Sequence, residues 1–203
     1  MTKHHFTLLA LGDSYTIGES IPLHESFPYQ TIHLLRKNGM HINAPEIVAQ
    51  TGWTTFDLAE HILHTHLDEH YDFVTLLIGV NNQYRGLPSE DYKTDFEFLL
   101  KKAIHFAADK NDHVIVLSIP DWGATPFAKG RDSKKVAEEI DAFNAINKSI
   151  SIQHKVHYVA ITEGTRLAVQ DTSLIAVDGL HYSAKEYADW AQQVVLVIES
   201  MIK

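Results

Sequence analysis

The chain has 203 residues, of which 45% are hydrophobic and 21% are charged, a composition typical of a globular domain. It carries 17 Lys and Arg against 26 Asp and Glu, a net charge of −9, which argues against nucleic acid or an anionic lipid surface as the main partner. The absence of cysteine excludes disulfide bonds and zinc sites built from thiolates.

Short apolar runs alternate with longer stretches of helical periodicity along the chain. In chain order, the patterns predict a strand at 6–11, a helix near 27–38, a strand at 46–50, a helix near 56–66, a strand at 73–78, a helix near 89–109, a strand at 113–119, a helix near 133–153 and a strand at 156–159. Buried strands separated by helices are typical of parallel pairing with right-handed crossovers. The sequence therefore predicts an α/β fold, a three-layer α/β/α sandwich around a central parallel sheet of about five strands.

The last helix has the clearest predicted start, at Ser183. Ser183 and Glu186 have the spacing of a capping box, in which the Ser side chain accepts from the third helical amide and the Glu side chain reaches back. We interpret the apolar stripe that follows as core. Such a cap would hold His181 on a short, rigid approach just outside the helix.

No internal repeat, low-complexity tract or flexible linker interrupts the chain, so we expect residues 1–203 to form a single domain. No apolar stretch approaches the ~20 residues of a membrane span. Residues 1–5 are too polar, and the run 6–11 is too short, for a signal peptide. We therefore expect a cytoplasmic location, although a secreted protein whose signal had been removed would show the same pattern.

Two short motifs far apart in the chain contain the residue types needed for acyl transfer. Ser14 follows the first predicted strand, where a turn can project its hydroxyl from the edge of the sheet. Asp178 and His181 are three residues apart, so both side chains can point from one turn toward one site. A His can accept the proton of a nucleophilic Ser while an Asp orients the His. Taken singly, Ser14 is better explained as a turn or helix-cap serine, and the interpretation depends on the combination.

Four motifs in order make the chain resemble the SGNH hydrolases, also called GDSL esterases or lipases. In this sequence they are Gly12-Asp13-Ser14, Gly52, Gly79-Val80-Asn81-Asn82 and Asp178-Gly179-Leu180-His181. The resemblance spans residues 12–181 and implies a flavodoxin-like fold and a serine esterase without a cofactor. It also implies catalytic roles for Ser14 as nucleophile, for His181 as general base, and for Asp178 as the carboxylate that orients His181.

The middle motifs imply an oxyanion hole made by the backbone amide of Gly52 and the side-chain amide of Asn81, and the backbone amide of Ser14 would be a third donor. Acyl transfer builds negative charge on the carbonyl oxygen, and each fixed donor there is worth about 2.7–4 kcal/mol. Without the other motifs, Gly52 would be interpreted as a turn glycine and Asn81 as a loop residue with local bonds. Asn82 stands where the family usually has Asp, so we expect different loop hydrogen bonds there. Asp13 is expected to be structural.

A second hypothesis concerns metal binding by four of the 14 histidines: His61, His64, His66 and His70. Spacings of three and four residues can place ligands on one face of a helix. The possible pairs do not coincide well, and no His-Glu-x-x-His signature is present. We therefore favour a solvated helix surface and expect no metal.

The turn Ser14-Tyr15-Thr16 suggests a different class of function. The alternative is a flavodoxin-like small-ligand or phosphate-binding protein without hydrolytic turnover. This turn follows the first predicted strand and could cradle a phosphate. That hypothesis explains neither Asn81 nor the pair of Asp178 and His181. A third alternative is a family member that binds a ligand without turning it over.

Several loop side chains near the expected site are candidates for substrate binding: Trp53, Asn82, Tyr84 and Leu180. Other apolar loop residues, Trp122 and Phe127 among them, could wall a small acyl pocket. Because no long apolar lid is evident, we hypothesise a small-molecule ester with a short acyl group, such as an acetyl group on a carbohydrate. Protonation of His181 should reduce the catalytic efficiency on the acid side.

Overall fold

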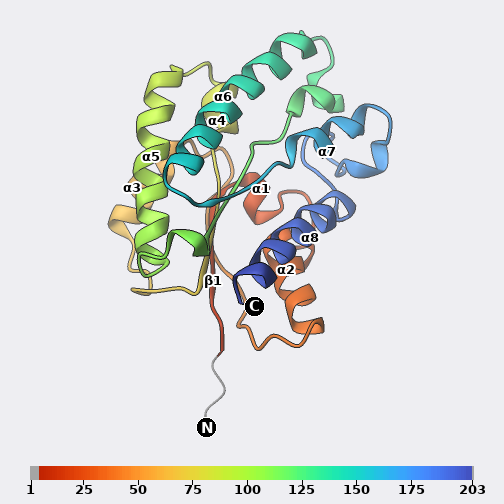
Figure 1. Ribbon diagram of the computed structural model, residues 1–203. Helices are drawn as coiled ribbons and strands as arrows, with labels where there is room; N and C mark the ends of the chain where they lie inside the picture. Colours follow the sequence, from red (N-terminus) through yellow and green to blue (C-terminus); the bar gives the residue numbers. More distant parts are fainter. Residues whose placement is uncertain (1–4, 203) are drawn as a thin grey trace.

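The computed structural model describes residues 5–202 and contains a parallel sheet between two layers of helices (Figure 1). Its strands are β1 Leu8–Asp13, β2 Glu46–Gln50, β3 Phe73–Leu77, β4 Val114–Leu117 and β5 His157–Val159. They lie in the order β2-β1-β3-β4-β5, and every neighbouring pair is parallel. The predicted α/β sandwich around about five parallel strands is confirmed.

Helices cover both faces of the sheet. α2 (Phe27–Lys37) packs with α8 (Ala184–Met201) on one face, whereas α3 (Thr55–His64), α5 (Ser89–Phe106) and α6 (Ser133–Gln153) cover the other (Figure 1). The chain leaves β1 toward α2 and leaves β3 toward α5, so the connections diverge between these two neighbouring strands. In open parallel sheets, ligands bind beyond the carboxyl ends of the strands at this switch point.

The central strands are enclosed on both faces. Every residue of β1, β3 and β4 is buried, whereas the edge strand β2 is exposed at both ends. Strands buried in this way read as continuous apolar runs rather than as alternating patterns. This explains why the central strands could be predicted from short hydrophobic runs.

β1 begins and ends two residues later than the predicted 6–11. Gly12 and Asp13 still pair with β2, so the strand continues to the residue before Ser14. A Cβ atom on Gly12 would lie 2.4 Å from the carbonyl oxygen of Leu77 in β3, which no side chain could tolerate. Glycine at this position therefore allows the two strands to stay paired up to the site.

The predicted capping box at the start of α8 is wrong, although Ser183 is the N-cap residue. The Ser183 hydroxyl donates to the carbonyl of Ser173 at 2.7 Å instead of capping its own helix. Glu186 is buried and accepts a hydrogen bond from the Trp190 indole at 2.9 Å. Tertiary partners have thus replaced the local capping bonds that the spacing predicted.

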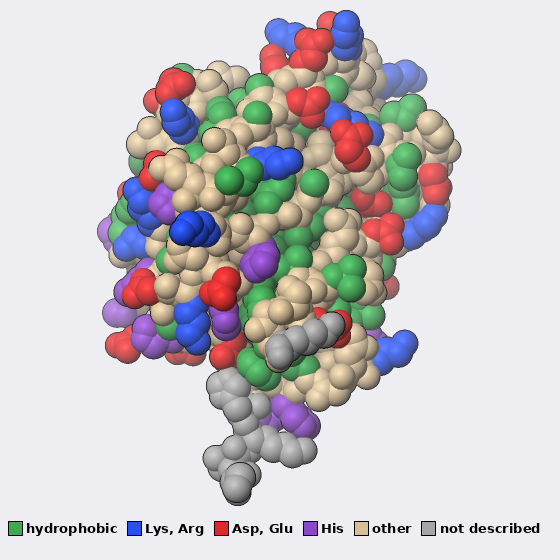
Figure 2. Space-filling view, viewed as in Figure 1, with side chains coloured by type: hydrophobic (Ala, Val, Ile, Leu, Met, Phe, Trp, Pro, Cys, Tyr) green, Lys and Arg blue, Asp and Glu red, His purple; other side chains and the backbone are tan. Residues whose placement is uncertain are grey.

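None of the helices within residues 5–202 has the length and apolar character needed to cross a membrane. On the face drawn in Figure 2, acidic and basic side chains are interspersed, with small groups of hydrophobic side chains between them. This face therefore presents a mixed surface in which neither sign of charge forms a continuous patch.

Candidate active site

Ser14 stands at the sharp transition from β1 to the short helix α1 (Ser14–Ile17). Asp13 precedes it as the N-cap, and its Oδ1 accepts a hydrogen bond from the Tyr15 amide at 3.0 Å. Gly18 ends the helix with a left-handed φ of +74°. The short turn of helix leaves Ser14 only 4% exposed, at the lining of a pocket.

Asp178 holds the buried His181 ring through a short contact. Its Oδ2 lies 2.5 Å from His181 Nδ1 and also accepts from the Ser20 hydroxyl at 2.8 Å, while its Oδ1 accepts the amides of Leu180 and His181 at 3.0 Å each. Partial burial raises the pKa of Asp178, but these hydrogen bonds, that from His181 first, outweigh it and lower the pKa to about 2. An ionised Asp178 keeps the proton on Nδ1 and leaves Nε2 as an acceptor.

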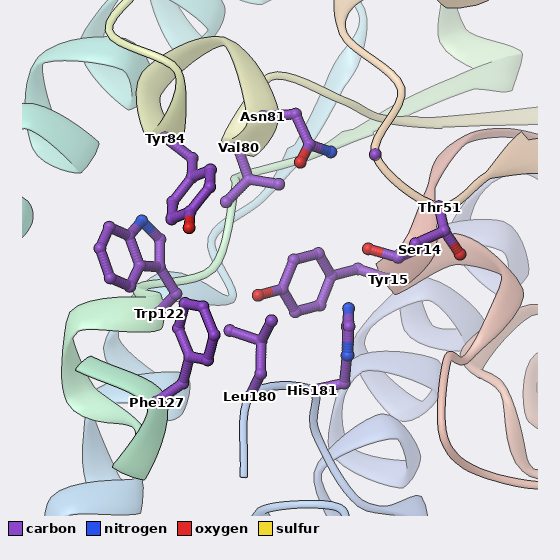
Figure 3. A pocket seen from close by; sticks show the side chains of 11 residues that line it. Ser14, Tyr15, Thr51, Val80, Asn81, Tyr84, Trp122, Phe127, Leu180 and His181 are labelled. Atoms are coloured by element: carbon purple, nitrogen blue, oxygen red, sulfur yellow. The ribbon is translucent and has the colours of Figure 1, made fainter. Parts of the chain in front are cut away.

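Ser14 and His181, far apart in the sequence, line the same pocket. Figure 3 shows the His181 ring beside Ser14, with one ring nitrogen directed toward it. Among the described residues, the side-chain hydrogen bond of His181 goes to Asp178 and not to Ser14. Contacts between a nucleophile and its base are often long without substrate and shorten when substrate binds. The structure therefore brings the predicted nucleophile and base to one place.

The three residues predicted to form the oxyanion hole, Ser14, Gly52 and Asn81, all line this pocket. Gly52 follows β2 with a φ of +82°, a conformation that favours glycine, and Arg85 donates to its carbonyl at 2.5 Å. Among the hydrogen bonds of the described residues, none uses the Gly52 amide. Asn81 donates one side-chain N–H to the Trp53 carbonyl at 3.0 Å, which leaves its second N–H available. Both groups can therefore donate to a substrate oxygen.

Asn82, predicted from the sequence as a substrate contact, does not line the pocket. It is 2% exposed, its Oδ1 accepts from the Thr55 amide at 3.0 Å, and its Nδ2 donates to the Thr55 hydroxyl at 2.8 Å. Thr55 is the first residue of α3, so Asn82 ties the start of that helix to the loop after β3. We therefore reassign Asn82 from substrate binding to support of α3.

Trp53 is the second predicted substrate contact that lies outside the pocket lining. Its indole packs against His61, with ring centroids 4.7 Å apart. Its carbonyl, rather than its ring, serves the site by holding Asn81. Trp53 lies in the loop that the sequence indicated, but its side chain packs against α3 instead of the pocket.

Tyr84 and Leu180, the other predicted substrate contacts, do line the pocket. An aromatic wall joins Tyr84 to Trp122 edge-to-face at 5.2 Å, and Trp122 to Phe127 at 6.1 Å. The Trp122 indole is fixed because its N–H donates to Gln83 at 2.7 Å. The space between these walls is about 150 Å³.

Three further residues line the pocket that were not predicted as site residues: Tyr15, Thr51 and Val80. Each is the sequence neighbour of a predicted site residue. That adjacency was the available signal, but the direction of a side chain on a turn cannot be read from adjacency alone.

Asp13 is completely buried beneath the nucleophile. Burial raises its pKa to about 7, against the lowering effect of the hydrogen bond from the Tyr15 amide. Its Oδ2 has no hydrogen-bond partner in the described part of the chain. Asp13 therefore caps α1 through Oδ1, while no hydrogen bond offsets the burial of Oδ2.

No group of three or more His, Asp or Glu side chains within residues 5–202 is placed to hold a metal ion. Of the four histidines considered above, His61 packs against Trp53. His64 lies on the exposed surface of α3, where its ring is 3.8 Å from Glu60. These contacts place two of the histidines on the surface of α3 rather than around a common centre.

A sequence profile of the GDSL-like lipase/acylhydrolase family matches residues 10–188. The chain belongs to this family. The resemblance based on the four motifs is therefore confirmed, and this GDSL-family protein is a carboxylic ester hydrolase. No curated protein matches the chain.

Solved structures of related hydrolases share the fold of this GDSL-family protein. A lipase/acylhydrolase from Enterococcus faecalis is 19% identical, with a TM-score of 0.72 over 97% of this chain and 96% of that one. The psychrotrophic esterase EstA from Pseudoalteromonas sp. is 19% identical, with a TM-score of 0.68 over 97% and 98%. An acetylxylan esterase from Geobacillus stearothermophilus is 15% identical, with a TM-score of 0.70 over 95% and 94%.

Proposed function

We propose that this GDSL-family hydrolase cleaves short-chain acyl esters through an acyl-enzyme formed on Ser14. The observation that carries the proposal is the convergence of Ser14, the His181–Asp178 pair, Gly52 and Asn81 on one small pocket. Acyl transfer requires a nucleophile, a base in a fixed tautomer and donors for an oxyanion. Together these five residues meet all three requirements.

In the acylation step, His181 Nε2 accepts the proton of Ser14 while the Ser14 Oγ forms a bond to the carbonyl carbon of the ester. The carbonyl oxygen becomes an oxyanion, which the amides of Gly52 and Asn81 stabilise by about 2.7–4 kcal/mol each. The intermediate then collapses. The bond from the carbonyl carbon to the alcohol oxygen breaks, and His181 gives its proton to that oxygen.

Water resolves the acyl-enzyme by the reverse sequence. His181 Nε2 accepts a proton from the water while the water oxygen forms a bond to the acyl carbon. The oxyanion forms again in the same hole, and the bond to Ser14 Oγ breaks as His181 returns its proton to that oxygen. The products are a carboxylic acid, an alcohol and the free enzyme.

Asp178 supports both steps through its charge. Its pKa of about 2 keeps it ionised at any pH where His181 is a useful base. A carboxylate 2.5 Å from Nδ1 stabilises the imidazolium that forms in each step and holds the ring in one orientation. We therefore assign Asp178 no proton transfer of its own.

The size of the pocket supports a short acyl group. A cavity of about 150 Å³ is the size that holds a benzene molecule in another protein, so we expect room for about six carbon atoms. The buried ring of Trp122, held by its hydrogen bond to Gln83, opposes extension of the chain. Because the half-exposed Tyr84 lies at the mouth, we extend the proposal to polar alcohols such as an acetylated carbohydrate.

A chain-length series of 4-nitrophenyl esters from acetate to dodecanoate tests this proposal. The wild type should show its highest kcat/KM between acetate and hexanoate. Ser14→Ala and His181→Ala should each lose at least about a thousandfold in kcat, whereas Ser200→Ala, a change at an exposed serine of α8, should retain full activity. Preferred turnover of dodecanoate, or near-normal activity of Ser14→Ala, would overturn the proposal.

A further inference from the structure

The phenol of Tyr15 is a polar group in the pocket that the catalytic steps above do not use. Tyr15 is only 2% exposed, and its ring packs against His181 with centroids 5.0 Å apart and against Tyr182 at 6.0 Å. Figure 3 shows its hydroxyl directed into the pocket, toward the space between Val80 and Leu180. The ring is therefore held rigidly while its oxygen faces the substrate space.

The Tyr15 oxygen has no hydrogen-bond partner among the described residues, yet it is not sealed inside the protein. Two other buried tyrosines have such a partner, whereas the buried Tyr187 hydroxyl has none among the described residues. The Tyr92 hydroxyl donates to the Ile78 carbonyl at 3.3 Å, and the Tyr182 hydroxyl donates to the Asp121 carbonyl at 3.0 Å. Buried phenols usually find such partners. An unpaired phenol that opens only onto a ligand pocket is most simply explained by a partner on the ligand.

The position of Tyr15 indicates which part of the ligand it meets. Tyr15 directly follows Ser14, and its ring extends from beside the nucleophile toward the recess lined by Val80, Leu180 and Trp122 (Figure 3). The acyl group remains bonded to Ser14 after the alcohol has left. The recess next to the nucleophile therefore suits the acyl group. Val80 and Leu180 beside Tyr15 are apolar, and the other phenol of the pocket, Tyr84, is half exposed at the mouth. An oxygen on the acyl chain close to Ser14 would therefore have Tyr15 as its partner.

We propose that Tyr15 is a specificity-determining residue whose hydroxyl donates a hydrogen bond to an oxygen in the acyl chain of the substrate. The favoured substrates would be esters of short hydroxy, keto or alkoxy acids rather than of plain alkanoic acids. Burial raises the pKa of Tyr15, so the phenol keeps its proton and remains a donor. A plain alkyl chain would leave this donor unpaired, which is unfavourable in an apolar site. The inference rests on the proposed esterase function.

Pairs of esters with the same shape isolate the contribution of this hydroxyl. Each pair exchanges one methylene for an ether oxygen in a 4-nitrophenyl ester: butanoate with methoxyacetate, pentanoate with 3-methoxypropanoate, and hexanoate with 4-methoxybutanoate. For each pair, the ratio of kcat/KM for ether over alkyl is measured in the wild type and in Tyr15→Phe. Dividing the two ratios cancels the intrinsic reactivity of each ester, because the same ester is used with both proteins.

The wild-type ratio should exceed the Tyr15→Phe ratio by about tenfold for at least one pair, and Tyr15→Phe should also gain activity on the plain alkyl esters. Tyr29→Phe removes a phenol from α2, outside this pocket, and should leave the ratios within about twofold of the wild type. Divided ratios near one for all three pairs would overturn the inference.

A binding measurement keeps the inference testable if Tyr15→Phe does not fold. Alkylboronic acids add to a reactive serine without a leaving group, so their inhibition constants do not depend on ester reactivity. In the wild type, 2-methoxyethylboronic acid should bind more tightly than butylboronic acid, or 3-methoxypropylboronic acid more tightly than pentylboronic acid. Equal or weaker binding of both methoxy compounds would contradict the inference.

The two proposals fail in different ways. If the wild type hydrolyses none of the esters faster than Ser14→Ala, the esterase proposal fails. If the wild type hydrolyses them all but the Tyr15→Phe ratios match its own, the esterase proposal stands and the assignment of Tyr15 is wrong.

Discussion

Replacing Asp13 with Asn should flatten the pH dependence of this protein's stability between about pH 4 and pH 7. The Asp13 carboxyl is fully buried, its Oδ1 accepts from the Tyr15 amide, and its Oδ2 has no partner among the described residues. Burial raises the pKa of this carboxyl from its ordinary value of 3.8 to about 7. An Asn side chain keeps the Oδ1 acceptor and has no charge to desolvate.

The size of the effect follows from these two pKa values. Between pH 3.8 and about 7, the folded protein binds a proton at Asp13 that the unfolded chain has already released. Stability from such a group is fully present below the unfolded pKa and is lost as the pH rises through the folded pKa. A difference of about three pH units corresponds to about 4 kcal/mol in the free energy of unfolding.

Urea unfolding of both proteins at several pH values between 4 and 8 measures this effect. The free energy of unfolding of the wild type minus that of Asp13→Asn should fall by about 4 kcal/mol across this range. Asp132→Asn is the matched control, the same substitution at the exposed N-cap of α6. A wild-type minus Asp13→Asn difference that stays constant within about 1 kcal/mol would refute the reasoning.

Three further substitutions separate chemistry from support. Asp178→Asn should lower kcat by about ten-thousandfold at neutral pH, because the carboxylate that fixes His181 is lost, and steady-state kinetics would show it. Asn81→Ala should lower kcat by about a hundredfold to a thousandfold with little change in KM, since it removes an oxyanion donor; a change confined to KM would argue against that role. Asn82→Ala should lower the free energy of unfolding by about 1–3 kcal/mol, because the hydrogen-bonding groups of Thr55 lose their buried partners. Its KM should stay unchanged. Urea unfolding and steady-state kinetics test both, and a raised KM at unchanged stability would indicate a binding role instead.

Part of the site could be predicted because three of its residues follow the ends of parallel strands. Ser14 follows β1, Gly52 follows β2 and Asn81 follows β3, and parallel strands bring these ends to one edge of the sheet. Apolar runs reveal such strands without any knowledge of the tertiary structure. The strand pattern was therefore enough to bring the nucleophile and the oxyanion donors to one edge, whereas the roles of Asp178 and His181 were implied by the family resemblance.

The remaining errors concern the hydrogen-bond partners of polar side chains. Ser183 has a cap spacing but donates to Ser173, and Asn82 has a loop position but binds Thr55. Spacing defines which local bonds are possible, whereas packing decides which bonds form. The orientation of Tyr15 into the pocket depends in the same way on the tight turn after β1, which no pattern of hydrophobicity encodes.

The central claim is that Ser14 is a nucleophile activated by His181, and covalent labelling tests it most directly. The wild type would be treated with an ethyl fluorophosphonate at neutral pH and analysed by intact mass and peptide mapping. We predict a single adduct, located on Ser14, with labelling that is lost in Ser14→Ala and strongly slowed in His181→Ala. An adduct at another residue, or labelling of Ser14 at the wild-type rate without His181, would contradict the account.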